Sequence, residues 1–98
     1  MRKTYYTDYV RHCLKFYSRY PKKRVFDTEA ERNDYLSAHT ALDVFPTYRP
    51  MLIEIYGDRD TLEDNVYNAS QTYRMVQNDI WHLMSKIELK VAKVRGLK

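Results

Sequence analysis

The feature that most constrains this chain is the scarcity of residues that break helices: its 98 residues include two glycines and three prolines. Between these breaks, apolar residues recur at steps of three and four, which is the spacing of one face of an α-helix. The first predicted helix runs from about Thr4 or Thr7 to Tyr20, and Pro21 ends it because proline disfavours a helical residue before it. Its apolar stripe consists of Tyr6, Val10, Cys13, Leu14 and Tyr17. We therefore predict an all-α fold.

A capping box predicts the start of the second helix. Thr28 is followed three residues later by Glu31, so the threonine side chain can accept a hydrogen bond from the Glu31 amide. We expect this helix to continue to about Val44. The residues predicted to share its inner side are Leu36, His39 and Leu42, with the histidine at the edge of the core.

The third predicted helix follows the break at residues 45–47. Thr47 is in position to cap it, and Pro50 is tolerated in its first turn. Its apolar face consists of Met51, Leu52, Ile55 and Tyr56. Gly57 follows this face, where the left-handed residue that commonly ends a helix is expected.

The remaining residues predict two further helices, the first capped by Thr61 and the second running from Gln77 or Asn78 to about Arg95. The inward positions of the first are Leu62, Val66 and Ala69, and those of the second are Ile80, Leu83, Met84, Ile87, Val91 and Val94. No glycine or proline separates them, but one helix of that length would be unusual in so small a domain. We therefore predict a single domain over residues 1–98, with four or five helices and the first helix packed on the last.

The residues around the predicted turn fit a helix-turn-helix, whose second helix enters the major groove of DNA. When Ile80 is taken as the first buried residue of that helix, Leu83 lies one turn later and Ser70 lies ten residues before, where close helix contact needs a small side chain. The rest of the predicted apolar wedge is Ala69, Tyr73 and Met75. Arg74 occupies the turn position that is usually glycine, because the backbone there is left-handed.

This register also predicts which residues would contact DNA. The side of the last helix opposite Ile80, Leu83 and Ile87 consists of Gln77, Asn78, Asp79, Trp81, His82, Ser85 and Lys86. Among these, the predicted base contacts are Gln77, Asn78 and His82, since amides near the helix start suit adenine edges. The predicted phosphate contacts are Arg74, Lys86, Lys90 and Lys93. Two alternatives stay open. Each basic side chain could be a solvated surface charge that binds nothing, and Asn78 could cap the helix.

Charge is distributed unevenly along the chain, whose net charge is +4. Residues 1–24 carry a net charge of +7, residues 25–64 carry −7, and residues 65–98 carry +4. Two basic ends suit phosphate, with the acidic middle turned away from it. The alternative is that oppositely charged helix faces attract each other within the fold.

A family resemblance rests on the sequence FPTYRPMLIEIYG at residues 45–57 and on TLED at residues 61–64. These segments resemble the fourth region of bacterial sigma factors, and the tail at residues 80–97 is similar to small sigma-like regulators of phages and integrative mobile elements in Gram-positive bacteria. The resemblance covers residues 45–97 and implies a sigma-like DNA-binding regulator rather than a complete sigma factor. Residues 1–44 form an N-terminal helical part, basic and then acidic, outside the resemblance.

The sequence offers no support for catalysis, and we expect neither an enzyme nor a cofactor or metal. His12 and Cys13 are adjacent on a helix and point about 100° apart, and the histidines lack the spacing of metal ligands. No apolar run approaches the roughly 18 residues that span a bilayer, and no apolar stretch follows the basic N-terminus. We therefore expect a cytoplasmic protein that does not enter membranes.

The expected function is transcription regulation through binding of double-stranded DNA. The alternative is a protein-binding module or inhibitor of a mobile element, which binds RNA polymerase or a host defence protein and does not bind DNA. RNA binding is a third hypothesis. A homodimer is a further hypothesis, because leftover apolar surface on the first and last helices would suit a two-fold interface.

Overall fold

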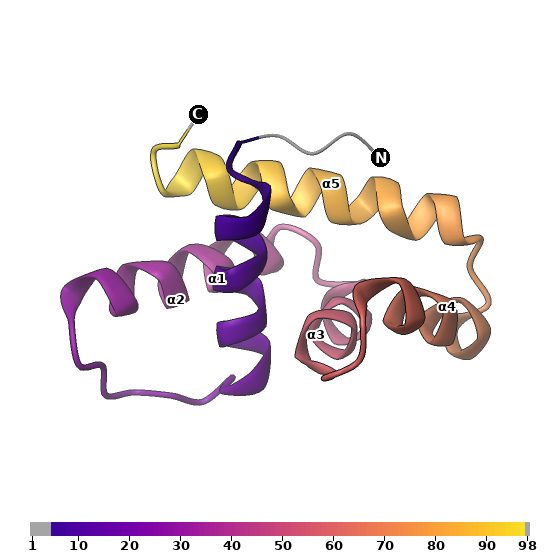
Figure 1. Ribbon diagram of the computed structural model, residues 1–98, viewed down its shortest axis with the longest axis horizontal. Helices are drawn as coiled ribbons and strands as arrows, with labels where there is room; N and C mark the ends of the chain where they lie inside the picture. Colours follow the sequence, from indigo (N-terminus) through magenta and orange to yellow (C-terminus); the bar gives the residue numbers. More distant parts are fainter. Residues whose placement is uncertain (1–4, 98) are drawn as a thin grey trace.

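The computed structural model describes residues 5–97, which form five α-helices and no strand (Figure 1). The helices are α1 (Thr7–Arg19), α2 (Glu29–Asp43), α3 (Arg49–Gly57), α4 (Leu62–Tyr73) and α5 (Gln77–Val94). The predicted all-α class is confirmed, and so is the break between the last two helices. Thr4, the other predicted start of the first helix, lies outside the described residues. No helix among them is long and apolar enough to cross a membrane.

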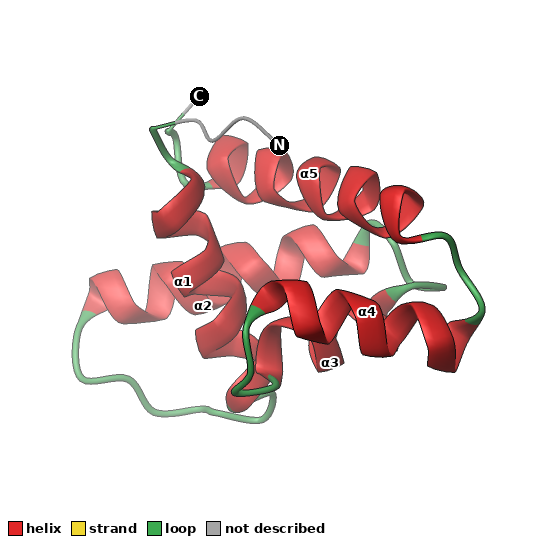
Figure 2. Ribbon diagram, turned by 45° about the vertical axis from the view of Figure 1, so that its right-hand side comes forward, coloured by secondary structure: helices red, strands yellow, loops and turns green. Residues whose placement is uncertain are grey.

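The arrangement is centred on α1, which packs against α2, α3 and α5. In Figures 1 and 2, α5 extends across one side of the molecule, while α3 and α4 lie together on the other. The predicted packing of the first helix on the last is therefore confirmed. Near the two ends of the chain, the Tyr5 hydroxyl donates a hydrogen bond to the carbonyl oxygen of Leu97.

The core forms where the predicted apolar stripes meet. Its largest fully buried side chains include Leu14 and Tyr17 of α1, Leu52 and Tyr56 of α3, and Ile87 of α5. Five of the six inward positions predicted on α5 are buried, which leaves its other side to solvent. Burial of such side chains is worth about 1.5–3 kcal/mol each, so these stripes supply the main drive for folding.

Polar contacts tie α5 to the other helices. One oxygen of the buried Glu88 carboxylate accepts hydrogen bonds from the Tyr56 hydroxyl at 2.6 Å and from Arg11 Nε at 3.0 Å. Just past the C-terminal end of this helix, Arg95 Nε lies 3.0 Å from a carboxylate oxygen of Asp34 in α2. Some of the positive charge at both ends of the chain is therefore neutralised within the fold.

Two of the three predicted threonine caps are present. The side chains of Thr28 and Thr61 accept hydrogen bonds from the amides three residues later, at 3.1 and 3.2 Å. The prediction for Thr47 was wrong, because α3 begins at Arg49 and its N-cap residue is Tyr48, which makes no side-chain capping bond.

The predicted role of Gly57 was also wrong. Gly57 belongs to α3, and the next residue, Asp58, ends the helix in an extended conformation with a φ of −67°. The glycine instead lies against α1, where an added Cβ would stand 3.3 Å from the backbone oxygen of Ser18. Its lack of a side chain permits the close approach of α1 and α3.

Two apolar residues assigned to inner faces are exposed. Leu36 on α2 is 41% exposed and Val94 on α5 is 44% exposed, because the neighbouring helices do not reach these edges. His39 lies at the edge of the core, as predicted, and its Nδ1 is 3.0 Å from the Tyr17 hydroxyl.

Candidate nucleic-acid interface

The connection between α4 and α5 is three residues long, 74–76, and it begins with a left-handed residue. Arg74 has a φ of 55° and a ψ of 47°, and its amide donates to the carbonyl of Ser70. The amide of Met75 bonds the same carbonyl at 3.2 Å. The prediction that Arg74 occupies the left-handed position is therefore confirmed, at a conformational cost of about 1–2 kcal/mol for a residue with a side chain.

The side chains around this connection hold the start of α5 in place. Ile80, Leu83, Ala69 and Ser70 are buried, and Met75 is half-buried against the core, as predicted. Tyr73 ends α4 as predicted, but the prediction that it belongs to the buried wedge was wrong. Its side chain is 36% exposed, and its hydroxyl donates to a carboxylate oxygen of Glu54 at 2.9 Å.

The three predicted base-contacting residues, Gln77, Asn78 and His82, are all exposed. Gln77 and Asn78 begin α5, and His82 lies one turn beyond Asn78 on the same side of the helix. Lys86 lies one turn further along that side and is also exposed. The first three turns of α5 therefore present two amides, an imidazole and an ammonium group to solvent.

The predicted phosphate-contacting residues also reach the surface. Arg74, Lys86 and Lys93 are exposed and Lys90 is half-buried. Within residues 5–97, none of the four lies within ion-pair distance of a carboxylate. The arginines of the core region behave differently, since Arg11 and Arg95 each pair with a carboxylate of another helix. The surface of α5 thus holds cations that the fold itself does not use.

The exposed face of α5 is narrower than predicted. Trp81 and Ser85, assigned to it, are half-buried, and Trp81 packs against the core. The Ser85 hydroxyl donates to the carbonyl of Trp81 at 3.1 Å, within the helix. Asp79 is exposed in the first turn, where a carboxylate stabilises the helix dipole but repels phosphate.

A basic loop lies away from this face. The loop between α1 and α2, which carries Lys22 and Arg24, is on the opposite side of the molecule from α5 in both views (Figures 1 and 2). The cations of this loop therefore do not join those of α5 in one surface.

Two side chains that carry chemistry are held in neutral form within the fold. Burial, followed by the nearby Asp34 carboxylate, raises the pKa of the Cys13 thiol to about 12. Burial and then the Glu88 carboxylate raise the pKa of Tyr56 well above its usual value. In the described part of the chain, no three histidine, cysteine or acidic side chains group so as to hold a metal ion.

Comparison with known proteins adds no relative. The chain matches no protein-family model, and neither a curated protein nor a solved structure is significantly similar to it. The case for function therefore rests on the geometry of α4, the Arg74 turn and α5.

Proposed function

We propose that this protein is a DNA-binding transcription regulator in which α4, the turn at residues 74–76 and α5 act as a helix-turn-helix. The observation that carries the proposal is the surface of α5, where Asn78, His82 and Lys86 follow one another at steps of four residues. The cations on and beside it have no carboxylate partner in the described structure. We propose a cytoplasmic location and no enzymatic activity for this role.

In the proposed complex, the start of α5 enters the major groove. Gln77 and Asn78 have the paired donor and acceptor that match adenine, and His82 lies one turn deeper along the groove. The cations at residues 74, 86, 90 and 93 bond phosphates, which fix the position of the helix but carry no sequence information. The resemblance of residues 45–97 to the fourth region of sigma factors supports the same assignment, and with it an origin in a phage or mobile element.

A protein-binding role is the second candidate, and one observation favours it. The loop between α1 and α2 exposes apolar side chains, with Tyr20 at 56% and Val25 at 78%, beside the exposed Lys22 and Arg24. A surface that is both basic and apolar suits an acidic protein surface, such as one on RNA polymerase. The homodimer stays a prediction. On the last helix, Val91 is buried within the chain, whereas Val94 is exposed.

The proposal is tested by the salt dependence of binding to a mixed-sequence duplex. Each phosphate contact contributes about −0.9 to the log–log slope, so the four predicted cations give a slope of about −3.6 and an affinity loss of about 150-fold between 50 and 200 mM salt. Lys86→Gln should reduce the magnitude of the slope by about one. Arg24→Gln is the matched control, because Arg24 is also exposed but lies on the opposite side, and it should leave the slope unchanged.

Base recognition is tested on a duplex selected from a random library. Asn78→Ala should weaken binding to the selected site by about 1–3 kcal/mol and relax the base preference there, while binding to unrelated duplex changes little. A slope near zero, or equal slopes for the parent and Lys86→Gln, would reject α5 as the DNA-contacting helix.

A further inference from the structure

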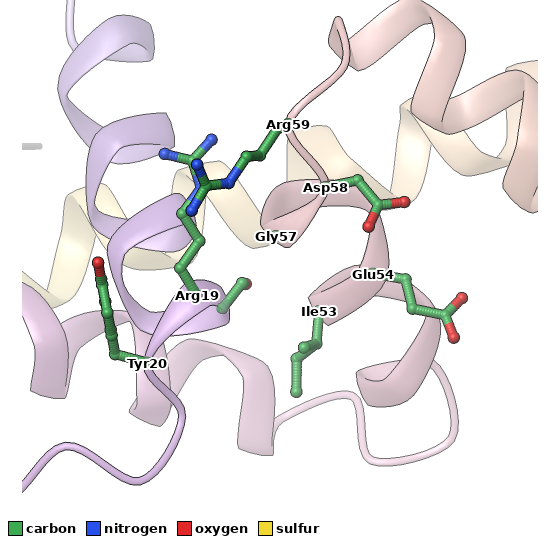
Figure 3. A pocket seen from close by; sticks show the side chains of 8 residues that line it. Arg19, Tyr20, Ile53, Glu54, Gly57, Asp58 and Arg59 are labelled. Atoms are coloured by element: carbon green, nitrogen blue, oxygen red, sulfur yellow. The ribbon is translucent and has the colours of Figure 1, made fainter.

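A second group of cations lies away from α5, at a pocket of about 380 Å³ between the C-terminal end of α1 and the segment joining α3 to α4 (Figure 3). Arg19 lines it from the last turn of α1, and Arg59 lines it from that segment. In Figure 3, both guanidinium groups extend toward the same side of the pocket. Neither is within ion-pair distance of a carboxylate among residues 5–97.

The acidic residues of the pocket do not neutralise this pair. Glu54 and Asp58 also line it, but Figure 3 shows their carboxylates directed away from the two arginines. The carboxylate of Glu54 accepts the hydrogen bond from Tyr73 described above. A cation in the last turn of α1 is explained by the helix dipole, but the dipole does not explain why Arg59 extends to the same side.

The segment that carries Arg59 is fixed rather than free. Asn65, which is 2% exposed, donates through its side-chain amide to the backbone carbonyls of Ile55, Asp58 and Asp60 at 2.8, 3.3 and 3.3 Å. These bonds hold the segment on both sides of residue 59. The positions of the two arginine backbones relative to each other are therefore set before any ligand arrives, which reduces the entropy lost on binding.

The rest of the wall offers further contacts. Ile53 and Tyr20 add an aliphatic side chain and an aromatic ring. A volume of about 380 Å³ falls within the range of small-molecule sites and exceeds what a bare tetrahedral anion would fill.

We propose that this Arg19–Arg59 pocket binds a small phosphomonoester, with the phosphate held between the two guanidinium groups. Each guanidinium presents a planar fork of donors that matches two oxygens of a phosphate, and two cations together match a dianion. The carrier of the phosphate would lie against Ile53. This site is independent of the proposed DNA-binding surface on α5.

The test is an NMR titration of backbone amides, first with inorganic phosphate and then with adenosine monophosphate, at an ionic strength held constant with sodium chloride. The expected result is a saturable shift of amides near residues 18–20 and 57–59. Arg19→Gln or Arg59→Gln should weaken binding at least about tenfold, because each removes charge-assisted hydrogen bonds. Arg32→Gln, at an exposed arginine outside the pocket, is the matched control and should bind like the parent.

The two ligands separate the sources of phosphate. Tighter binding of adenosine monophosphate supports a phosphomonoester, and equal affinities overturn that part of the proposal because the carrier then makes no contact. Shifts that do not saturate, or that are the same in Arg19→Gln and the parent, overturn the site itself. Since Arg19→Gln leaves α5 intact, it should also keep the salt slope on DNA, so this proposal and the DNA-binding proposal fail separately.

Discussion

The carboxylate of Glu88 provides the sharpest test of how the helices are held together. Glu88 is 5% exposed, and one of its oxygens accepts hydrogen bonds from Tyr56 on α3 and Arg11 on α1. In Glu88→Ala, both bonds disappear, and an arginine side chain that is 16% exposed is left without its partner. Breaking a buried ion pair from one side costs about 3–5 kcal/mol.

Because Arg11 keeps some contact with water, we expect the lower end of that range, a loss of about 3 kcal/mol in the free energy of unfolding. For a chain of this size, about 3 kcal/mol lowers the Tm by about 12–24 °C. Glu88→Gln retains the shape and can still accept both hydrogen bonds through its amide oxygen. It loses the charge and places an NH2 group where the second carboxylate oxygen stood, but both hydrogen bonds are kept, so we expect a smaller loss of about 1 kcal/mol.

The assay is urea unfolding followed by circular dichroism at neutral pH, with thermal unfolding beside it. Glu63→Ala is the matched control, because Glu63 is an exposed acid in the first turn of α4 and should cost less than about 1 kcal/mol. A loss for Glu88→Ala no larger than that of Glu63→Ala would refute the reasoning, since the buried carboxylate would then contribute no more than a surface charge.

Two further predictions concern single residues. Arg74→Gly should raise the free energy of unfolding by about 1 kcal/mol, since glycine adopts the left-handed conformation at φ 55° without strain. The same substitution should weaken DNA binding, because it removes a predicted phosphate contact. Urea unfolding and duplex binding measure the two effects, and a destabilised variant would contradict the strain argument. The pKa of Cys13 is raised from 9.0 to about 12 in the folded chain, so the stability it contributes is complete below pH 9 and is lost as the pH rises toward 12. Cys13→Ala should therefore flatten the dependence of stability on pH between 9 and 12, and an unchanged profile would contradict burial of the thiol.

Local signals in the sequence predicted the fold where the deciding contacts are local. Thr28 and Thr61 cap their helices with bonds to amides three residues away, so the residue pattern alone contains the information. The break at Arg74 is different in kind, because no glycine or proline marks it there. A break was predicted because one helix of that length would be unusual in so small a domain. Its place at Arg74 came from the spacing of Ser70 and Ile80, which reflects the contact between two helices rather than the preference of the turn residue.

Several errors occur where a distant helix decides the outcome. Gly57 has a sequence context typical of a helix end, yet it is required by the approach of Ser18 from α1. Leu36 and Val94 lie at the edges of apolar stripes, and periodicity does not reveal how far a neighbouring helix extends over such an edge. The same limit applies to the Arg19–Arg59 pocket, because its two arginines are 40 positions apart in sequence and meet only through the packing of α1 on α3.

Glu88 was missed although a signal was present. It lies one turn after Met84 and one residue after Ile87, both of which are buried, so helical spacing places its carboxylate on the inner face. A charge at such a position requires a partner from another helix. Arg11 and Tyr56 were not identifiable as those partners, because pairing three helices depends on the tertiary arrangement.

The two faces of α5 therefore carry charge for different reasons. On the inner face, Glu88 is held by hydrogen bonds from two other helices, so its replacement should lower the free energy of unfolding. On the outer face, Lys86 and Lys93 are exposed and form no ion pair within residues 5–97, so substitutions there should change stability by no more than about 0.5 kcal/mol. Because folding and surface charge are separated in this way, a loss of DNA binding in Lys86→Gln would report on the contact itself rather than on a damaged fold.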